Sequence, residues 1–253
     1  MVHHLIQGRT VTMPVEVREA TAGMATYLVR ADAARAIIAY SGLDVVEPLP
    51  GKAVCALAFI EYLDGDLGPY REFAVTFLVA GPGDRPVRRD RLVPRVAEVF
   101  HPGAGAFVHW LPVTQAFTME AGQSIWGFPK ELADVDIRMR TPYKRCVLRK
   151  DGRLVLDLLI KPGVPVPGGV AGPWTGRRGL AVDAYTHRDQ VTRRVPWVCR
   201  AEGVRARPGG ALIRLGNHPI AKELSELGLP CRALMTGSVR HLQMTFHGAE
   251  EAG

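Results

Sequence analysis

One lysine lies in a setting that favours covalent chemistry. Lys130 follows Phe128 and Pro129 in the segment Glu120-Ala-Gly-Gln-Ser-Ile-Trp-Gly-Phe-Pro-Lys-Glu-Leu-Ala133, which also holds two glycines and a tryptophan. An ammonium group that is removed from water loses hydration, which favours the neutral amine. A neutral amine is a nucleophile toward ketones and forms Schiff bases with them. A lysine after a proline turn is more often a surface residue, so this segment must be interpreted with the elements around it.

The other reactive residues are not spaced for metal or redox chemistry. The four cysteines, Cys55, Cys146, Cys199 and Cys231, are far apart, with no CxxC pair and no Cys/His spacing typical of zinc sites. We expect reduced, buried thiols and a cytoplasmic protein. No signal peptide is recognised, and the apolar runs are far shorter than the roughly 20 residues of a membrane-spanning helix.

The charge balance suits an anionic substrate. The chain has 32 Lys and Arg against 25 Asp and Glu, a net charge of +7. Arginines concentrate between Asp84 and Arg95, but no aromatic residue is interleaved there for base stacking. We therefore expect a solvated loop or helix face in this segment, no nucleic-acid partner and no membrane partner, and a small anionic molecule as substrate.

The elements that must position the lysine are mostly strands. The composition, 47% hydrophobic and 23% charged, is that of an ordinary globular protein. Gly and Pro, numbering 27 and 19, resist long helices and favour short strands, several of which alternate apolar and polar residues. The predicted strands are Ala25–Val29, Ala53–Tyr62, Phe73–Val79, Ala106–Leu111, Gln115–Ala121, Val135–Arg140, Arg145–Lys150, Arg153–Ile160, Leu180–Tyr185, Ala211–Leu215 and Arg232–Phe246. So many strands require a closed or layered sheet.

Two helices are expected beside these strands. The first is Ala33–Tyr40, with Asp32 available to cap its first turn, and the second is Ile220–Leu227, which ends before Gly228. No internal repeat or long linker divides the chain, so one domain over residues 1–253 is predicted.

The pattern Gly-x-x-x-Trp-Gly-Phe-Pro-Lys, residues 122–130, closely resembles the active-site segment of the acetoacetate decarboxylase family. Tyr70-Arg-Glu72 resembles a Tyr-x-Glu element of that family, and Leu229 to Phe246 resembles its C-terminal region. The resemblance extends from about Pro14 to Phe246. It implies a mainly β (α+β) fold, an antiparallel, cone-like closed β-barrel with a few peripheral helices, and homo-oligomers that use no cofactor.

The resemblance also implies roles for particular residues. Lys130 would be the Schiff-base lysine, and Glu72 a pocket carboxylate that holds the ammonium, moves protons or pushes against a substrate carboxylate. Arg18 resembles an N-terminal arginine near the cavity mouth that can grip a carboxylate. The further candidates for substrate binding are Gln115, Gln123, Trp126 and Phe128.

Several positions depart from the family pattern. Glu131 replaces a second lysine, and Gln123-Ser124 replaces an Arg-Glu pair. Leu57 occupies the place of another family glutamate, for which Glu61 could substitute if the strand register differs. Residues 82–100 have no counterpart, so the arginine-rich segment would be an insertion, either a lid or an oligomer contact.

Strand alternation leaves further polar residues to be placed. It puts His109 and Gln115 on one face of their strand and Trp110 on the other. Three polar residues of the last long strand, Arg240, His241 and Gln243, are weaker candidates for contact with the substrate. The sequence alone does not show which face of this strand is turned toward the cavity.

Three functions follow from these observations. The first is a cofactor-independent lyase that decarboxylates a small, acetoacetate-like 3-oxo acid through an imine on Lys130. The second is a Schiff-base aldolase or dehydratase that acts on a pyruvate-derived or larger 2-oxo acid, which the altered neighbours of the lysine favour. The third, of another class, is a β-barrel that binds a small ligand without turnover.

Overall fold

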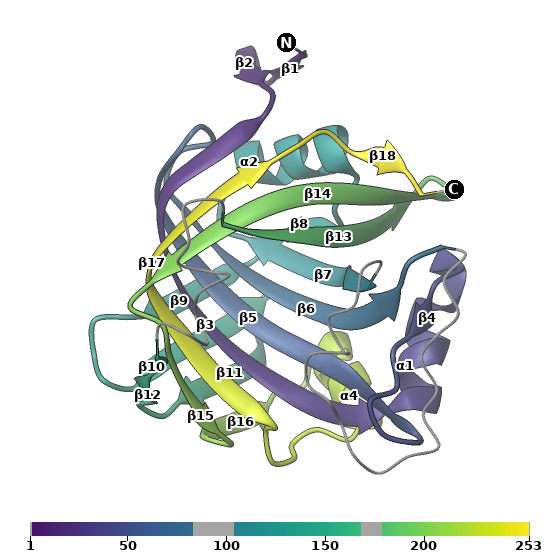
Figure 1. Ribbon diagram of the computed structural model, residues 1–253, viewed down its shortest axis with the longest axis vertical. Helices are drawn as coiled ribbons and strands as arrows, with labels where there is room; N and C mark the ends of the chain where they lie inside the picture. The colour runs from purple at the N-terminus through teal and green to yellow at the C-terminus, as the bar shows by residue number, and fades with distance from the viewer. Residues whose placement is uncertain (1, 83–103, 168–178, 253) are drawn as a thin grey trace.

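The structure is a computed structural model that describes residues 2–82, 104–167 and 179–252. In Figure 1 long, curved strands wrap around a common axis, with short helices outside them. The arginine-rich segment of residues 84–95 lies outside the described residues.

A closed barrel forms the centre of the described chain. Seven strands pair in the order β17-β3-β5-β6-β7-β13-β14, and β14 pairs back with β17 to close the ring. Neighbours in the ring are antiparallel except β7 and β13, which are parallel over a short register. The barrel strands are β3 (Val15–Arg30), β5 (Lys52–Gly65), β6 (Tyr70–Ala80), β7 (Ala104–Val113), β13 (Leu180–Arg188), β14 (Val191–Glu202) and β17 (Met235–Phe246). The mainly β, closed-barrel fold expected from the sequence is confirmed.

A second, four-stranded sheet packs against the outside of the barrel. Its order is β16-β11-β10-β9. These strands are β9 (Asp134–Arg138), β10 (Lys144–Lys150), β11 (Arg153–Ile160) and β16 (Ala211–Leu215). The shorter strands are β1 (His3–Ile6), β2 (Arg9–Thr12), β4 (Asp44–Val45), β8 (Lys130–Leu132), β12 (Val164–Pro165), β15 (Arg205–Pro208) and β18 (Glu250–Glu251).

The helices are short and peripheral. They are α1 (Ala31–Ile38), followed by a 3-10 turn at Ala39–Ser41, α2 (Ala116–Ala121), followed by a π-helical turn at Gly122–Trp126, and α4 (Pro219–Glu226). The strand predicted at Gln115–Ala121 was wrong, because this segment is α2 and buries Phe117, Thr118 and Ala121 along one side. None of the helices in the described part of the chain is long and apolar enough to cross a membrane.

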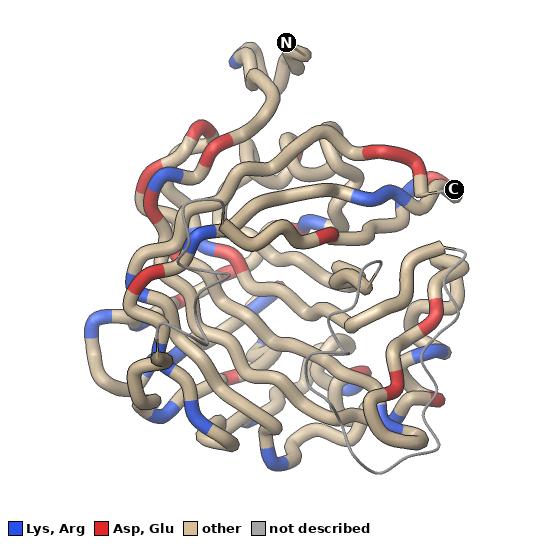
Figure 2. Tube along the Cα trace, in the orientation of Figure 1, with Lys and Arg blue, Asp and Glu red and all other residues tan. Residues whose placement is uncertain are grey.

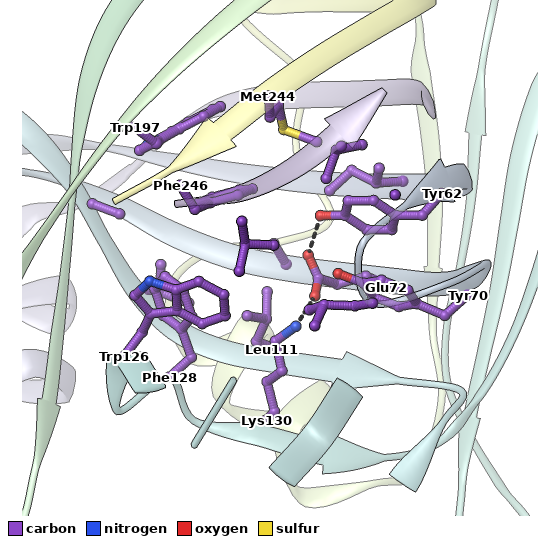
Figure 3. Close-up of a pocket in the computed structure, with 18 of the residues that line it drawn as sticks. Tyr62, Tyr70, Glu72, Leu111, Trp126, Phe128, Lys130, Trp197, Met244 and Phe246 are labelled. Atoms are coloured by element: carbon purple, nitrogen blue, oxygen red, sulfur yellow. Dashed lines mark hydrogen bonds and ion pairs between the residues drawn. The ribbon is translucent and has the colours of Figure 1, made fainter. Parts of the chain in front are cut away.

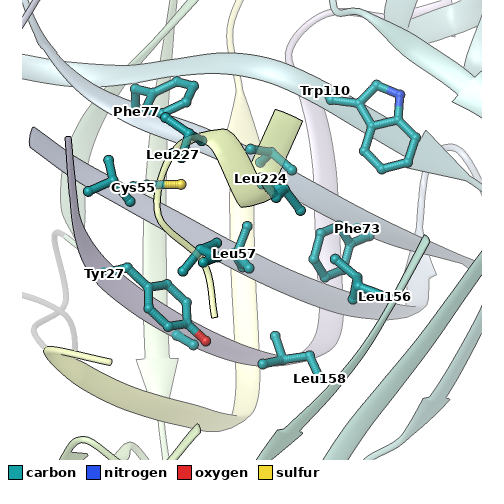
Figure 4. Packing of buried hydrophobic residues seen from close by; sticks show 14 of the residues in the cluster. Tyr27, Cys55, Leu57, Phe73, Phe77, Trp110, Leu156, Leu158, Leu224 and Leu227 are labelled. Carbon is teal, nitrogen blue, oxygen red and sulfur yellow. The ribbon is translucent and has the colours of Figure 1, made fainter. Parts of the chain in front are cut away.

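Alternation along the barrel strands divides the apolar residues into two cores. One set of side chains points outward and packs against the second sheet, α1 and α4. Figure 4 shows Tyr27, Leu57 and Phe73 of this set in one cluster with Leu156 of the second sheet. The other set points into the barrel and includes Tyr62, Leu111 and Met244, which pack in one cluster with Trp126 of the π-helical turn. The inward set surrounds the cavity described below.

Charged residues are spread over many elements. In Figure 2 Lys and Arg occur on several separate segments, with Asp and Glu interspersed along parts of the chain. The net positive charge of the sequence is therefore not concentrated on one element of the described structure.

Candidate active site

Lys130 is positioned by a turn in which Gly127 has a left-handed backbone conformation. After the π-helical turn, Gly127 adopts a left-handed conformation with φ of 74°, and its N–H donates to the Gln123 carbonyl at 3.1 Å. A side chain other than glycine is disfavoured in this conformation. Pro129 then leads into β8, where Lys130 pairs with Leu111 of β7. The lysine therefore begins a short parallel strand and points into the barrel.

The lysine side chain is buried and is paired with a buried carboxylate. Lys130 Nζ lies 2.7 Å from Glu72 Oε2, and the two side chains are only 4% and 6% exposed. Glu72 comes from β6 and Lys130 from β8, so two separate elements supply the pair. Figure 3 shows both side chains meeting at the edge of the cavity. Two charges removed from water in this way are tolerated only because they are paired.

Two tyrosines surround this pair. The hydroxyl of Tyr62 donates to Glu72 Oε1 at 2.8 Å. Its ring stacks on that of Tyr70 with 4.1 Å between centroids, and Lys130 Nζ lies 5.1 Å from the centroid of the Tyr70 ring. Burial raises the pKa of both phenols well above the usual range, and the charge of Glu72 raises it further. Tyr62 is therefore a neutral donor that holds one oxygen of Glu72 while the other faces the lysine.

The pair lies in a cavity of about 150 Å³ inside the barrel. Among the described lining residues, Lys130 and Glu72 are the only charged ones, and no arginine or histidine occurs. The wall is otherwise mostly apolar and is lined by Val15, Val17, Ile60, Leu67, Ala74, Ala106, Val108, Leu111, Ala184, Met244 and four large aromatic residues, Trp126, Phe128, Trp197 and Phe246. The cavity is thus mostly apolar and contains one buried lysine–carboxylate pair.

The four substrate-binding candidates near the motif lie in different places. Trp126 and Phe128 line the cavity with their ring centroids 5.9 Å apart. Gln123 donates its side-chain amide to the Lys130 carbonyl at 2.7 Å, so it supports the turn rather than lining the cavity. Gln115 is exposed and donates to the carbonyl of Pro69.

Arg18 lies outside the cavity. Its guanidinium makes two hydrogen bonds to Asp64 and one to Asp66, at 2.7 to 2.8 Å, and its side chain is 47% exposed. The alternation of β3 explains this placement, because the neighbouring Val17 faces the cavity. Arg18 is therefore not brought together with Lys130 and Glu72.

Glu131 is directed away from the cavity. Its carboxylate accepts from the Trp110 indole at 3.3 Å and pairs with Lys150 at 2.9 Å. Burial by itself would raise the pKa of Glu131, but the hydrogen bonds from Lys150 and Trp110 outweigh it and lower that pKa. Glu131 therefore pairs with other residues, and Lys130 pairs with Glu72.

The register of β5 shows that neither Leu57 nor Glu61 supplies a second carboxylate to the cavity. Leu57 is fully buried in the outward-facing core, and Glu61 accepts hydrogen bonds from Arg71 outside the cavity. Ile60, Tyr62 and Gly65 are the residues of β5 that line the cavity. A tyrosine hydroxyl rather than a second carboxylate thus contacts Glu72.

Polar residues of two other strands also point away. His109 of β7 contacts Glu223 of α4 at 2.7 Å on the outside of the barrel. On β17, Arg240, His241 and Gln243 are exposed, whereas Met244 and Phe246 line the cavity. The described residues contain no group of three or more His, Cys, Asp or Glu that could hold a metal ion.

Sequence reasoning missed four residues of the site. Tyr62, Met244 and Phe246 line the cavity but belong to predicted strands to which no role in the site was given, and Trp197 lies in β14, a strand that was not predicted. Their alternation with outward-facing neighbours was a signal, but it became usable only once Lys130 and Glu72 had fixed the inner face.

Fold and site together define a closed β-barrel with a buried lysine–carboxylate pair in an apolar interior. The sequence profile described as acetoacetate decarboxylase (ADC) matches residues 7–251, nearly the whole chain. The chain therefore belongs to the acetoacetate decarboxylase family, as its motif indicated. No curated protein sequence matches it significantly.

Solved structures share the fold at low sequence identity. Acetoacetate decarboxylase from Legionella pneumophila subsp. pneumophila str. Philadelphia 1 has a TM-score of 0.66 and 15% identity, with 97% of this chain and 91% of that chain covered. The enduracididine biosynthesis enzyme MppR, solved with pyruvate, has a TM-score of 0.61 and 18% identity, with 96% and 92% covered. An acetoacetate decarboxylase-like enzyme from Sphingomonas wittichii RW1 has a TM-score of 0.58 and 17% identity, with 95% and 94% covered.

Proposed function

We propose that this protein is a cofactor-independent Schiff-base lyase that decarboxylates a small 3-oxo acid through an imine on Lys130. The observation that carries this proposal is the burial of Lys130 in an apolar cavity, with Glu72 at 2.7 Å as its only charged neighbour among the described lining residues. A structural lysine gains nothing from such a place, because desolvation makes a buried charge costly. A lysine that attacks a ketone must first give up a proton, and the carboxylate of Glu72 lies within reach to accept it.

The reaction balances with groups that the chain supplies. The neutral amine of Lys130 adds to the ketone carbon, and loss of water gives a protonated imine. The bond between the carboxylate and its neighbouring carbon then breaks, its electron pair moves toward the imine nitrogen, and carbon dioxide leaves. The resulting enamine takes a proton on carbon, and water releases the ketone and the free amine. The imine nitrogen is itself the electron sink of this sequence.

Glu72 is placed to serve the proton transfers. Its Oε2 faces the lysine nitrogen, so it can accept the ammonium proton before attack and return a proton to the enamine later. The hydrogen bond from Tyr62 fixes the other oxygen. A substrate carboxylate held in the same apolar space would be poorly solvated and near a second negative charge, which favours its departure as neutral carbon dioxide.

The second candidate function is a Schiff-base aldolase or dehydratase. It forms the same imine on Lys130 but then makes or breaks a carbon–carbon bond, or removes water, without loss of carbon dioxide. MppR, which shares the fold, has been solved with pyruvate and with the condensation product of pyruvate and imidazole 4-carboxaldehyde. An imine of pyruvate on Lys130 would give an enamine that attacks an aldehyde, as an aldolase or dehydratase requires. The absence of arginine among the described lining residues leaves both acids without a guanidinium partner, so products must separate the two.

Borohydride trapping tests the proposal directly. The protein is incubated with acetoacetate or with pyruvate, reduced, digested and weighed by mass spectrometry. An adduct on the Lys130 peptide that has lost the carboxylate supports decarboxylation. An adduct that retains the carboxylate and then adds an aldehyde supports the second candidate. A Lys130→Arg variant that keeps ligand affinity, in a protein that traps no carbonyl compound, would instead support a binding barrel without turnover.

Homo-oligomeric assembly and a cytoplasmic location stay predictions. Light scattering of the purified chain at several concentrations tests the first, and fractionation of the source cells tests the second.

A further inference from the structure

The cavity extends well beyond the reacting pair. Lys130 lies beside Leu111 on β7, but the lining continues along the same strand to Val108 and Ala106. At the usual rise of a strand, Ala106 lies on the order of 15 Å from Leu111. The neighbouring strands follow, since β6 contributes Ala74 and Thr76 beyond Glu72 and β13 contributes Ala184, which pairs with Ala106.

Small side chains keep this extension open. Ala74, Ala106 and Ala184 face it, and a larger residue at any of them would project into the space. The opposite wall is aromatic, with Trp126 against Phe246 at 5.9 Å between centroids and Phe246 stacked on Trp197 at 5.4 Å. Figure 3 shows these rings on the side of the cavity away from Tyr62 and Glu72.

Size and polarity define what can fill this space. The whole cavity, including the end that holds Lys130 and Glu72, has a volume of about 150 Å³. A cavity of this volume can hold one benzene ring, so an apolar group of the substrate can be no larger than a phenyl ring. The hydrogen-bonding groups Tyr62 and Glu72 are already paired at the other end. Water in the extension would find few polar partners, so an apolar group of the substrate is the better occupant.

We propose that the oxo acid carries an apolar group, no larger than a phenyl ring, on its ketone carbon, and that this group lies between β6, β7 and β13. This inference rests on the proposed function and names the substrate class of that site. The ketone carbon meets Lys130, the carboxylate end lies toward Glu72 and Tyr62, and the apolar group contacts the aromatic wall. Ala184 determines how large that group can be.

The test compares acetoacetate with 3-oxo-3-phenylpropanoate. The wild-type kcat/KM for the phenyl acid should exceed that for acetoacetate by more than about tenfold, since apolar contacts of this size discriminate strongly. Ala184→Leu should lower the ratio of the two values by at least about tenfold. Ala181→Leu, an exposed position of the same strand, should keep the wild-type ratio. A wild-type ratio at or below one, or a ratio that Ala184→Leu leaves unchanged, overturns the inference.

A second variant tests the same inference if Ala184→Leu does not fold. Val108→Ala enlarges the same region, and it should raise the ratio for a naphthyl analogue over the phenyl acid. A ratio that does not rise counts against the assignment of β7 to the apolar group.

A non-reactive probe separates this inference from the proposed function. 1-Phenylethanol has no carbonyl group, so its binding, followed by quenching of Trp126 and Trp197 fluorescence, does not depend on an imine. Saturable quenching that Ala184→Leu abolishes and Ala181→Leu keeps supports the apolar subsite even if no acid is trapped on Lys130. Trapping of acetoacetate without any binding of 1-phenylethanol would leave the lyase standing and overturn the subsite.

Discussion

The side chain of Lys130 crosses directly over the Cα atom of Gly122. A Cβ atom at Gly122 would lie 2.4 Å from Lys130 Cδ and 2.6 Å from its Cε. Real Cβ atoms essentially never approach other atoms so closely, so the lysine takes its path into the cavity because position 122 has no side chain. The first glycine of the motif thus makes room for the lysine side chain and is not needed there for backbone freedom.

Gly122→Ala should therefore displace the lysine and leave the barrel intact. We expect the yield of borohydride-trapped adduct on Lys130 to fall by more than about tenfold, because a shift of an ångström in a reacting group is costly. Far-ultraviolet circular dichroism checks the fold. Gly248→Ala is the matched control, since nothing lies within 4 Å of a Cβ there. Full trapping by Gly122→Ala would show that the lysine can reach the substrate by another path.

Removal of one member of the buried pair should destabilise the protein, and removal of both should not. Glu72→Leu leaves Lys130 without its partner, which we expect to cost about 3 kcal/mol or more in free energy of unfolding. Lys130→Met combined with Glu72→Leu should recover most of that loss, because the surrounding wall is apolar. Glu131→Gln, which breaks the partly exposed pair with Lys150, should cost less than about 1 kcal/mol. Urea denaturation measures all three, and a double variant as unstable as the single one would contradict the expectation.

Tyr62→Phe should slow turnover without preventing imine formation. The variant leaves Glu72 Oε1 without its donor, so we expect kcat to fall by about tenfold or more while trapping on Lys130 persists. Tyr143→Phe, an exposed tyrosine, is the control. A kcat equal to that of the wild type would mean that the hydrogen bond from Tyr62 to Glu72 contributes nothing to turnover.

The raised pKa of Tyr62 makes the stability of the folded protein depend on pH in the alkaline range. Burial raises this pKa in the folded chain above its unfolded value of about 10. The associated stability is therefore complete below about pH 10 and is lost as the pH rises through the folded pKa. Thermal unfolding between pH 8 and pH 11 should show a smaller alkaline loss for Tyr62→Phe than for the wild type.

Arg18→Ala should leave the KM for oxo acids unchanged. The guanidinium is engaged by Asp64 and Asp66 on the outer face of β3, so no substrate contact is lost. Steady-state kinetics with the acid that the wild type uses best measures this. A raised KM would mean that Arg18 leaves its two carboxylates and reaches the substrate.

Protonation of Asp157, which lies on β11 of the second sheet, should destabilise the folded protein at low pH. Hydrogen bonds from Arg145 lower the pKa of this carboxyl, and its side chain is only 13% exposed. A depressed folded pKa gives stability that is present above the unfolded value of about 3.9 and is lost as the pH falls through the folded pKa. Asp157→Asn should be less stable than the wild type at pH 7, with a shallower loss toward pH 2. Asp136→Asn, at a more exposed carboxylate, should behave as the wild type does.

The sequence predicted the parts of this structure that depend on local pattern. Alternation located most barrel strands, and the motif that ends in Lys130 indicated the family. Alternation also misled, because Gln115–Ala121 alternates like a strand yet buries residues 117, 118 and 121 as a helix does. Strand β14, with Pro196 and several arginines in it, was not predicted at all, since its pairing with β13 and β17 outweighs its composition.

The site was predicted only where a residue belonged to a motif. Lys130 and Glu72 come together in the structure, but Arg18 was placed at the cavity mouth without knowledge of the face that β3 presents. One step along a strand reverses the direction of a side chain, so Arg18 points out where Val17 points in. Tyr62 could not be assigned before the register of β5 against β6 was known.

The closure of the barrel by β17 has a consequence for the order in which the protein acquires its chemistry. β17 pairs with β3 and β14, and it supplies Met244 and Phe246 to the wall around Lys130. The strand that follows the lysine by about a hundred residues must therefore dock before the amine is shielded from water. Pairings between such distant segments form slowly, so during synthesis the nascent chain carries a hydrated lysine that is buried only when the ring closes.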